Sequence, residues 1–531
     1  MEQDVQTERR RTTEHVLVRR SVWHLAFAAA ALVLVVLTWR LELVFDDSFI
    51  SFRYSKHLAN GEGLRFNLGT NPPVEGYSNL LWVLWCTIPE LFSFDTPKWA
   101  LWSNLVCGLA LVAWVLLFLA KRVKPSALTV FATALFLATL PSMAVYSTGG
   151  LETMAFALAL FIVFERLCGE SDEPRLVAAS LAAAAAVLLR PDGVLWAGVL
   201  CALVLVRALR ERDAQLKRAA VTVGVIALAC FGAQTAWRYG YHGDWLPNTV
   251  RAKASMSAMT LERGGKYALS FLVHYPAITL ALILACWIAA AKRQPLVLEC
   301  LLFVGAMFAY VVAVGGDFLP MGRFLLPALP FVAILFACLT ERCVVTSRPL
   351  AILGAALFIA LSVLPHFDRY TSPASVRAFT HYNWNFDEYL SEIELLDGER
   401  RRSEELSEMG RALKMYLKPT DSIVIGTVGA AGYYSELFIF DQFGLVNREV
   451  AAMPGHGRRL AAGHDRYAPA KFFKHYSPTY AQVSLVEPES DTRPLAIGVS
   501  ERIGRRRIPL TAEDGFQSGK TLLLIEPRGR D

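Results

Sequence analysis

Two adjacent carboxylates, Asp46 and Asp47, stand directly after the first apolar run of the chain. Neighbouring negative charges repel each other, and partial removal from water disfavours the ionised form, so both effects raise a carboxyl pKa. A carboxyl that titrates near neutral pH is suited to act as a general base. A pair of anchors at a membrane boundary, or a solvated helix end, explains the same two residues equally well.

Cations follow the pair closely: Arg53, Lys56 and Arg65 come within twenty residues. They could simply form ion pairs with the carboxylates. Several cations beside a membrane surface also make a binding site for a lipid phosphate. Glu75 and Tyr77 add further polar groups to the same loop. The segment therefore fits either a structural network of ion pairs or a site for a phosphate.

Further polar candidates occupy turns between later apolar runs. Glu152 opens such a run, where an acidic residue favours a helix N-terminus, so a structural role is as good an explanation as a functional one. Arg190 precedes Asp192 by two residues in a tight turn, and the two could merely pair.

The longest loop between apolar runs contains Asp244 and Asn248, where polar residues are expected in any case. Asp317 and Arg323 flank a short return of the chain towards the apolar region. This second arrangement is more suggestive of a site, but a structural ion pair explains it equally well.

No metal site is legible in the sequence. The C-x-x-C and Cys/His spacings of zinc sites are absent. His456, His464 and His475 are irregularly spaced in a polar segment, so we expect solvated loop residues and not ligands. The acidic pair and Glu75 offer oxygen atoms of the kind that Mg²⁺, Mn²⁺ or Ca²⁺ bind, so a divalent cation is compatible with the sequence but unassigned.

Composition identifies the elements that must position these residues. Of 531 residues, 54% are hydrophobic and 19% charged, whereas soluble domains are usually about 45–50% apolar and about a quarter charged. Between residues 22 and 365 the apolar residues form runs long enough to cross a membrane. The net charge of +6 lies mainly between these runs, which is typical of membrane topology and argues against nucleic acid as a partner.

Charge also predicts the orientation of the chain. Five arginines precede the first run, which places the N-terminus in the cytoplasm. The run has no convincing cleavage site, so we interpret it as a span and not a signal peptide. The stretch 79–94 is short and broken by Pro89 and Glu90, so we expect a helix lying along the outer surface.

With that choice, eleven spans are predicted, with the C-terminus outside. Their ranges are 22–38, 99–120, 126–146, 151–167, 175–190, 192–208, 219–237, 268–290, 296–314, 321–340 and 349–365. The polar turns with candidate residues then all face the external side. Such one-sided chemistry indicates an enzyme working at that face, because a channel or carrier more often has ionisable residues near the middle of its spans.

These patterns divide the chain into three parts. Residues 1–21 form a basic cytoplasmic tail, residues 22–366 a transmembrane domain with an external loop at 40–98, and residues 367–531 a soluble periplasmic domain. All nine cysteines lie in or beside apolar runs, so the soluble domain is not a disulfide scaffold.

The soluble domain is predicted to be α/β. A charged helical pattern covers 383–417, and a glycine-rich turn at 426–432 leads from a strand into a helix. The expected strands are 421–426, 437–441, 480–486 and 521–525. Strand, turn, helix and strand form a βαβ unit. The turn lacks the G-x-G-x-x-G spacing of dinucleotide sites, so its glycines are better explained by close packing of helix on strand.

At this point the motifs resemble a known family. The blocks 46–54 (DDSFISFRY), 61–67 (GEGLRFN) and 74–82 (VEGYSNLLW) resemble a bacterial family of GT-C-type glycosyltransferases. It includes the terminal arabinofuranosyltransferase of the mycobacterial cell wall, and some members are labelled flagellar motor control proteins. Similar later blocks are 147–153 (STGGLET), 188–193 (LLRPDG), 241–249 (YHGDWLPNT), 315–320 (GGDFLP), 323–327 (RFLLP) and 429–434 (GAAGYY).

The resemblance implies a polytopic enzyme that takes its sugar from a polyprenyl-phosphate donor and inverts the anomeric centre. It implies that Asp46 is the base, and Asp47 is a second candidate that orients the acceptor or Arg53. Cations must then stabilise the departing lipid phosphate. The candidate residues for the donor phosphate or substrate are Arg53, Lys56, Glu75, Tyr77, Glu152, Arg190, Asp192, Asp244, Asn248, Arg251, Lys253, Asp317 and Arg323.

The leading hypothesis is therefore an inner-membrane glycosyltransferase that acts on the outer face. Arabinofuranose is one candidate sugar, and the acceptor is a surface glycan, glycolipid or protein. A transporter or flippase for a lipid-linked sugar is an alternative, although no internal repeat is detectable. A non-catalytic flagellar or envelope accessory protein is another.

Overall fold

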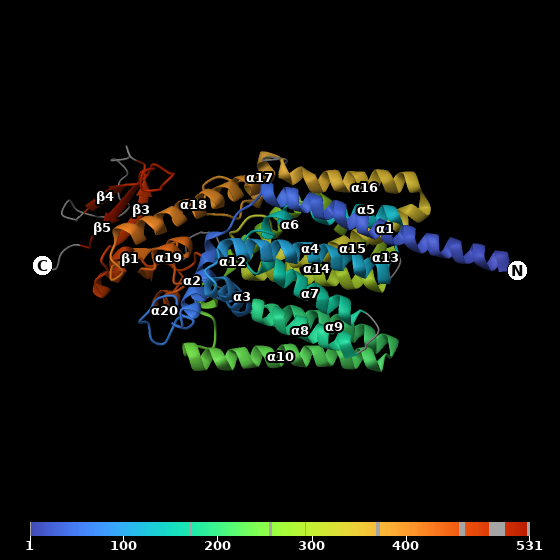
Figure 1. Ribbon diagram of the computed structural model, residues 1–531, viewed down its shortest axis with the longest axis horizontal. Coiled ribbons are helices and arrows are strands. Elements are labelled where there is room, and N and C mark those ends of the chain that lie inside the picture. The colour runs from blue at the N-terminus through green and yellow to red at the C-terminus, as the bar shows by residue number, and fades with distance from the viewer. Residues whose placement is uncertain are drawn as a thin grey trace.

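The computed structural model describes residues 2–168, 173–253, 257–291, 294–367, 372–455, 462–487 and 505–527. Helices dominate it, and most of them lie side by side in a long bundle that fills one half of the elongated molecule (Figure 1). The other half holds the strands and most of the helices of the C-terminal segment, among them the long α18 (Glu392–Tyr416). The N-terminus lies at the far end of the bundle, and the C-terminus at the opposite end of the molecule.

The bundle and its loops comprise most of the helices. They are α1 (Glu2–Arg40), α2 (Asp46–Ala59), α3 (Leu80–Leu91), α4 (Thr96–Arg122), α5 (Ala127–Thr139), α6 (Pro141–Tyr146), α7 (Thr153–Leu167), α8 (Glu173–Leu189), α9 (Gly193–Glu211), α10 (Ala214–His242), α11 (Asn248–Lys253), α12 (Ala258–His274), α13 (Pro276–Ala291), α14 (Pro295–Val314), η1 (Arg323–Ala328), α15 (Leu329–Thr346), α16 (Arg348–Val363) and η2 (Leu364–His366).

Seven of the described helices are long and apolar enough to cross a membrane, and a bent pair makes up to eight. The α15 segment lies at the centre, with 83% of its apolar stretch buried, whereas α1 and α10 keep most of theirs exposed. Exposed apolar surface is what a helix presents to lipid, so the molecule is a multi-pass membrane protein. The predicted number of eleven spans stays a prediction.

Two of the predicted spans are not continuous helices. In the predicted span 268–290, α12 and α13 meet at an angle of 96°, so the segment is a broken helix, and its crossing of the membrane stays a prediction. The break falls at Tyr275, which precedes Pro276, and a residue before proline is disfavoured in the helical conformation. The predicted span 126–146 is likewise interrupted at Leu140, the residue before Pro141, where α5 gives way to α6.

The C-terminal segment contains two small sheets. Its helices are α17 (Ala374–Thr380), α18 (Glu392–Tyr416), α19 (Gly429–Ser435), α20 (Arg448–Ala451) and η3 (Ala470–Tyr476), and its strands are β1 (Ser422–Ile425), β2 (Phe438–Asp441), β3 (Gln482–Val486), β4 (Arg505–Pro509) and β5 (Thr521–Ile525). Strands β1 and β2 are parallel, with α19 between them in sequence, which confirms the predicted βαβ unit. Strands β3, β5 and β4 form an antiparallel sheet in that order.

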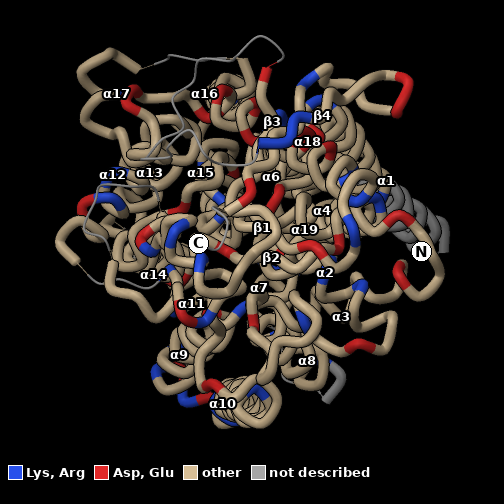
Figure 2. The backbone as a smooth tube through the Cα atoms, turned by 90° about the vertical axis from the view of Figure 1, so that its left-hand side faces the viewer, with Lys and Arg blue, Asp and Glu red and all other residues tan. Residues whose placement is uncertain are grey.

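The βαβ unit sits on the end of the bundle, directly against the first loop (residues 40–98). Figure 2, which looks onto this end, shows β1, β2 and α19 over the middle of the bundle, with α10 at its edge. The approach is close: a Cβ atom at Gly429 would lie 2.0 Å from the carbonyl oxygen of Asp46, so only glycine fits. The sequence predicted that the turn glycines allow a helix to pack closely on a strand. At Gly429 the glycine instead allows α19 to pack closely on α2.

Candidate active site

A cavity of about 560 Å³ opens where the bundle meets the C-terminal segment, and we call it the large cavity. Its walls come from the first loop, from the turns before α7, α9 and η1, from α11 and the end of α14, and from the C-terminal segment. Its polar lining residues are Asp47, Ser51, Tyr77, Ser78, Asn79, Glu152, Arg190, Asp192, Thr249, Lys253, Tyr310, Asp317 and Arg323. The motif turns that are far apart in sequence therefore meet at one place.

The two carboxylates of the first loop lie in the first turn of α2 but point in different directions. Asp46 is only 6% exposed, and its Oδ1 accepts a hydrogen bond of 2.7 Å from the backbone N–H of Ala430, at the start of α19. Burial raises the pKa of Asp46 to about 6; the Ala430 hydrogen bond opposes this rise and the charge of Asp47 adds to it. Asp46 does not line the large cavity.

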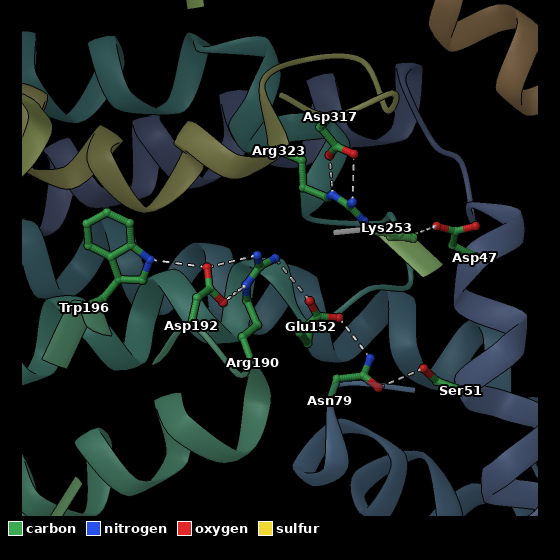
Figure 3. Close-up of polar contacts among 10 residues, drawn as sticks. All are labelled: Asp47, Ser51, Asn79, Glu152, Arg190, Asp192, Trp196, Lys253, Asp317 and Arg323. Atoms are coloured by element: carbon green, nitrogen blue, oxygen red, sulfur yellow. Dashed lines mark hydrogen bonds and ion pairs between the residues drawn. The ribbon is translucent and has the colours of Figure 1, made fainter. Parts of the chain in front are cut away.

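Asp47 faces the large cavity, as Figure 3 shows, and its carboxylate lies 4.0 Å from Nζ of Lys253. Successive residues of a helix are about 100° apart, which explains why Asp47 shares its direction with Ile50 and Ser51 and not with Asp46. Both Ile50 and Ser51 line the same cavity. The α2 helix thus has one face towards the cavity and another towards α19.

Two buried arginines line the large cavity, and each is bound by a carboxylate in a forked pair (Figure 3). Arg190 donates from Nε and Nη2 to Asp192 at 2.9 and 3.2 Å, and it lies 3.5 Å from Glu152. Arg323 donates from Nε and Nη2 to Asp317 at 2.5 and 2.9 Å. Bidentate pairs fix the orientation of a guanidinium group.

The carboxyl group of Asp192 is held in its ionised form by Arg190. Burial alone would raise the pKa of Asp192, but the charge and hydrogen bonds of Arg190 outweigh it, and the pKa lies below its usual range. Since Arg323 uses only Nε and Nη2 for Asp317, its Nη1 makes no hydrogen bond among the described residues and keeps its donors for a ligand.

A chain of hydrogen bonds connects Glu152 with α2. Asn79 donates to Glu152 at 2.9 Å, and Ser51 donates to Asn79 at 3.1 Å (Figure 3). Asn79 and Ser51 were not among the candidates from sequence. Both residues lie in motif blocks, and membership of a block was the only indication of function that the sequence offered for them. A neutral side chain gives no such indication by its charge.

Arg53 and Lys56, candidates for the phosphate, do not line the large cavity. Arg53 is 2% exposed and donates from Nη1 to the carbonyl of Gly432 at 2.8 Å and from Nη2 to that of Leu437 at 2.7 Å. Lys56 pairs with Glu436. These cations bind the C-terminal segment, and the structure separates them from Arg190 and Arg323.

Of the remaining candidates, some line the large cavity and others hold the surrounding loops in place. Glu75 forms a buried ion pair of 2.5 Å with Arg238, away from the cavity, and burial raises the pKa of Glu75 to about 7 against the effect of Arg238. Tyr77 lines the cavity and its hydroxyl lies 3.2 Å from His242.

The candidates in the loop before α12 likewise include residues that line the cavity and residues that do not. Asn248 donates to the carbonyls of Gly444 and Leu445 at 2.6 and 2.9 Å and so ties the loop to the C-terminal segment. Asp244 pairs with Arg251 at 2.5 Å, and neither lines the cavity. Of this loop's candidates, only Lys253 reaches it.

The acidic residues considered for a divalent cation are not brought together, because Glu75 is held by Arg238. Within the described part of the chain, no group of three or more histidine, cysteine or acidic residues is arranged to hold a metal ion. The expectation of solvated histidines is wrong for His464, whose ring packs between Phe318 and Phe443. His475 is exposed as expected, and His456 lies outside the described residues.

Comparison with solved structures shows which fold this is. Two crystal structures of ArnT from Cupriavidus metallidurans match it: the complex with undecaprenyl phosphate (TM-score 0.57, 15% identity, covering 96% of this chain and 99% of that one) and the apo state (0.58, 14%, 97% and 100%). The chain has the ArnT fold. The predicted GT-C-like membrane domain with a C-terminal α/β domain is thereby confirmed.

The other comparisons are more limited. An oligosaccharyltransferase from Archaeoglobus fulgidus, in complex with Zn and sulfate, matches at a TM-score of 0.46 and 12% identity, over 78% of this chain and 62% of that one, which is too weak to support an argument. Residues 392–516 match the model of a domain of unknown function, DUF8728. Comparison with curated proteins finds no match.

Proposed function

We propose that this protein is an inverting glycosyltransferase that moves a sugar from a polyprenyl-phosphate donor to a hydroxyl group of a cell-envelope acceptor. The observation that carries the proposal is the meeting of Asp47, Lys253, Arg190 and Arg323 in one cavity of a GT-C-like fold. ArnT, which has the same fold over nearly its whole length, has been crystallised with undecaprenyl phosphate. A lipid phosphate is therefore the ligand that the arginines would take.

The charges balance in such a reaction. The acceptor oxygen attacks the anomeric carbon, its proton passes to a carboxylate, and the bond between that carbon and the phosphate oxygen breaks. The carboxylate loses its negative charge, and the phosphate changes from a singly charged diester to a doubly charged monoester. Catalysis needs cations at the phosphate and an ionised base near the hydroxyl.

The geometry favours Asp47 as that base, where the family resemblance pointed first to Asp46. Asp47 faces the cavity, whereas an oxygen of Asp46 is occupied by the N–H of Ala430. We assign Asp46 to holding α19 in place. Arg323, with donors to spare, and Arg190 and Lys253 then stabilise the growing charge on the phosphate.

The orientation proposed from the charge distribution determines on which side of the membrane the reaction takes place. With the N-terminus in the cytoplasm, the cavity and the C-terminal domain lie on the outer face of the inner membrane, where polyprenyl-phosphate sugars meet surface polymers. The acceptor is a surface glycan, glycolipid or protein. Arabinofuranose is the sugar that the family resemblance suggests.

The test uses isosteric variants of the two neighbouring carboxylates. Asp47→Asn should lower transfer by about 10²–10⁴-fold, since that is the usual contribution of a general base. Asp46→Asn should keep most of the activity, because an amide oxygen still accepts the Ala430 hydrogen bond. Glu62→Gln, at an exposed position of the same loop, is the matched control.

The measurement is mass analysis of lipid-linked sugars and surface glycans in a deletion strain complemented with each variant. Loss of transfer should leave the donor accumulated and the product one sugar short. If the protein is a flippase, the purified protein in detergent will form no product. If it is an accessory protein, the double variant Asp46→Asn, Asp47→Asn will leave the glycans unchanged. Either result would refute the proposal. Loss of activity with Asp46→Asn alone would restore the first assignment.

A further inference from the structure

A second, smaller cavity of about 50 Å³ lies on the other side of Asp47, between α2 and the C-terminal segment. It shares six lining residues with the large cavity, so the two meet: Asp47, Ile50, Lys253, Phe318, Leu445 and Gly463. The residues that line only the small cavity are Asp46, Glu399, Arg402, Gly426, Thr427, Val428, Phe443 and His464. All of these except Asp46 belong to the C-terminal segment.

The small cavity is lined by groups that bind hydroxyls. The side chain of Glu399 is 17% exposed and lies 3.9 Å from Nη1 of Arg402, whose Nη2 donates to the hydroxyl of Thr427 at 3.5 Å. Burial raises the pKa of Glu399 to about 7; Arg402 opposes the rise, and Asp47 and Asp46 add to it. A carboxyl group that titrates near neutral pH can either accept a hydrogen bond or donate one.

Aromatic rings form another part of the wall. The imidazole of His464 lies between Phe318 and Phe443, with ring centroids 5.4 and 5.0 Å away and both contacts edge to face. A few polar groups placed beside apolar rings are typical of a site for a small ligand with both kinds of surface. A sugar ring has this character, because its hydroxyls stand around apolar C–H faces.

We propose that the small cavity is the acceptor subsite and that it takes a sugar unit, so that the acceptor is a glycan. The proposal rests on the proposed function. A volume of about 50 Å³ holds roughly three to four water-sized groups, enough for the reacting hydroxyl and its neighbours. In this position the hydroxyl lies beside Asp47, and the anomeric carbon of the donor approaches from the large cavity.

The arrangement fits a glycan better than a peptide acceptor. A peptide bound as an extended strand would need free backbone groups at a sheet edge. The outer edge of β2 is already occupied, because Asn67 donates to the carbonyl of Ile439 at 2.8 Å and accepts from its N–H at 3.0 Å. The cavity therefore offers side chains, which suit the hydroxyls of a sugar.

The experiment measures two ligands on the full-length protein in lipid nanodiscs. One is undecaprenyl phosphate, and the other is a panel of methyl glycosides (the pyranosides of glucose, galactose and mannose, and an arabinofuranoside), measured by saturation-transfer NMR with undecaprenyl phosphate present. The variants are Glu399→Gln and Thr427→Val. Glu404→Gln is the matched control, since Glu404 lies on the same helix and is exposed.

We expect the wild type to bind at least one glycoside. Glu399→Gln should weaken that binding about 10- to 100-fold, the usual value of one hydrogen bond to a charged group, and Thr427→Val should weaken it less. Both variants should bind undecaprenyl phosphate as the wild type does, which also shows that they fold. Glu404→Gln should change neither ligand.

Three results would overturn the subsite. They are binding of no glycoside by the wild type, equal glycoside binding by Glu399→Gln and Glu404→Gln, and displacement of the glycoside by a serine- and threonine-containing peptide with higher affinity. Glycoside binding that depends on Glu399, in a protein that does not bind undecaprenyl phosphate, would support the subsite and count against the proposed donor. Failure of the two proposals can thus be told apart.

Discussion

Helix α2 presents two charged faces that differ in what they touch. Asp46 and Arg53 are seven residues apart, two helical turns, and both face α19. Asp46 accepts from the N–H of Ala430 at the start of α19, and Arg53 donates to the carbonyl of Gly432 within α19 and to that of Leu437, which follows the helix. A carboxylate at a helix N-terminus and a cation near its C-terminus both match the helix dipole.

The other face of α2 carries Asp47 and Ser51 into the large cavity. There the cations come from distant turns, as Arg190 and Arg323, and not from α2 itself. The comparison teaches that adjacent carboxylates can have separate tasks, and that a cation near them in sequence need not be near their substrate. Variants on the two faces should accordingly change different measured quantities.

The largest effect is expected in the cavity. Arg323→Gln should lower kcat/KM for transfer about 10²–10³-fold, because removal of one donor that stabilises the charge of a transition state has this size. The measurement is transfer from a polyprenyl-phosphate sugar by purified protein.

The control for Arg323→Gln is a double variant that also removes the charge of Asp317, which the single change leaves buried without its partner. In Asp317→Asn with Arg323→Gln no carboxylate stays buried without its partner, so the double variant should regain the thermal stability of the wild type but not its activity. If the double variant also regained transfer, Arg323 would be a structural residue, and the distinction between the two groups of arginines would fail.

On the face towards α19, the expected effect is on stability. Arg53→Met leaves two backbone carbonyls without their charged donor, and each buried group left unsatisfied costs about 1–3 kcal/mol. We therefore expect a loss of about 2–6 kcal/mol in the free energy of unfolding. Thermal unfolding in detergent, followed by fluorescence, measures it.

Arg53→Lys separates charge from geometry, because lysine keeps the charge but cannot reach both carbonyls with a planar fork. It should recover part of the stability only. A normal unfolding temperature for Arg53→Met, together with weaker binding of undecaprenyl phosphate, would instead place Arg53 at the donor and unite the two groups.

The sequence predicted much of this arrangement, and its failures are instructive. Apolar runs located the seven described helices that are long and apolar enough to cross a membrane, and the turn glycines between two predicted strands located the βαβ unit. The bend at Tyr275 was missed, since hydropathy does not record the direction of a helix. Strand β4 was missed because the run RRRIP has a single apolar position that is buried, Ile508, and its other residues are exposed, so no alternation of polar and apolar residues marks it as a strand.

Within the site, the motif turns were recognised, but not the partners of their residues. Arg53 and Arg323 both belong to motif blocks, and only the fold shows that Arg53 meets backbone carbonyls and Arg323 a cavity. Glu399 and Arg402 lay in a charged helix with no pattern that marks a site. Contacts between residues far apart in sequence are set by packing, which a single sequence does not display.

A smaller effect concerns the pH dependence of stability at Asp46. Its pKa rises from the unfolded value of 3.8 to about 6 through burial, so the folded state binds the proton more tightly. The resulting stability is present below about pH 4 and is lost as the pH rises through 6, by up to about 3 kcal/mol.

Asp46→Asn removes this dependence. The free energy of unfolding of the wild type, relative to that of the variant, should therefore fall between about pH 4 and pH 6 and change little above that range. The difference between the two proteins is the relevant quantity, because Asp441 also has a raised pKa and contributes equally to both, whereas Glu399 loses only the part of its pKa rise that the charge of Asp46 causes. A difference that does not change with pH would mean that Asp46 keeps its charge at the contact with α19.

The smallest effect is expected at Lys56, which lies at the partly exposed edge of the face of α2 that contacts α19. Its ammonium group pairs with Glu436, lies 5.3 Å from the ring centroid of Tyr433, and is partly exposed. Exposed ion pairs contribute about 0–1 kcal/mol, so Lys56→Met should change the free energy of unfolding by less than about 1 kcal/mol and transfer by less than about twofold. If instead every cation of the first loop bound the phosphate, Lys56→Met would lower kcat/KM strongly. Steady-state kinetics of Lys56→Met and Arg323→Gln, measured side by side, therefore distinguishes that hypothesis from the division of α2 into two faces.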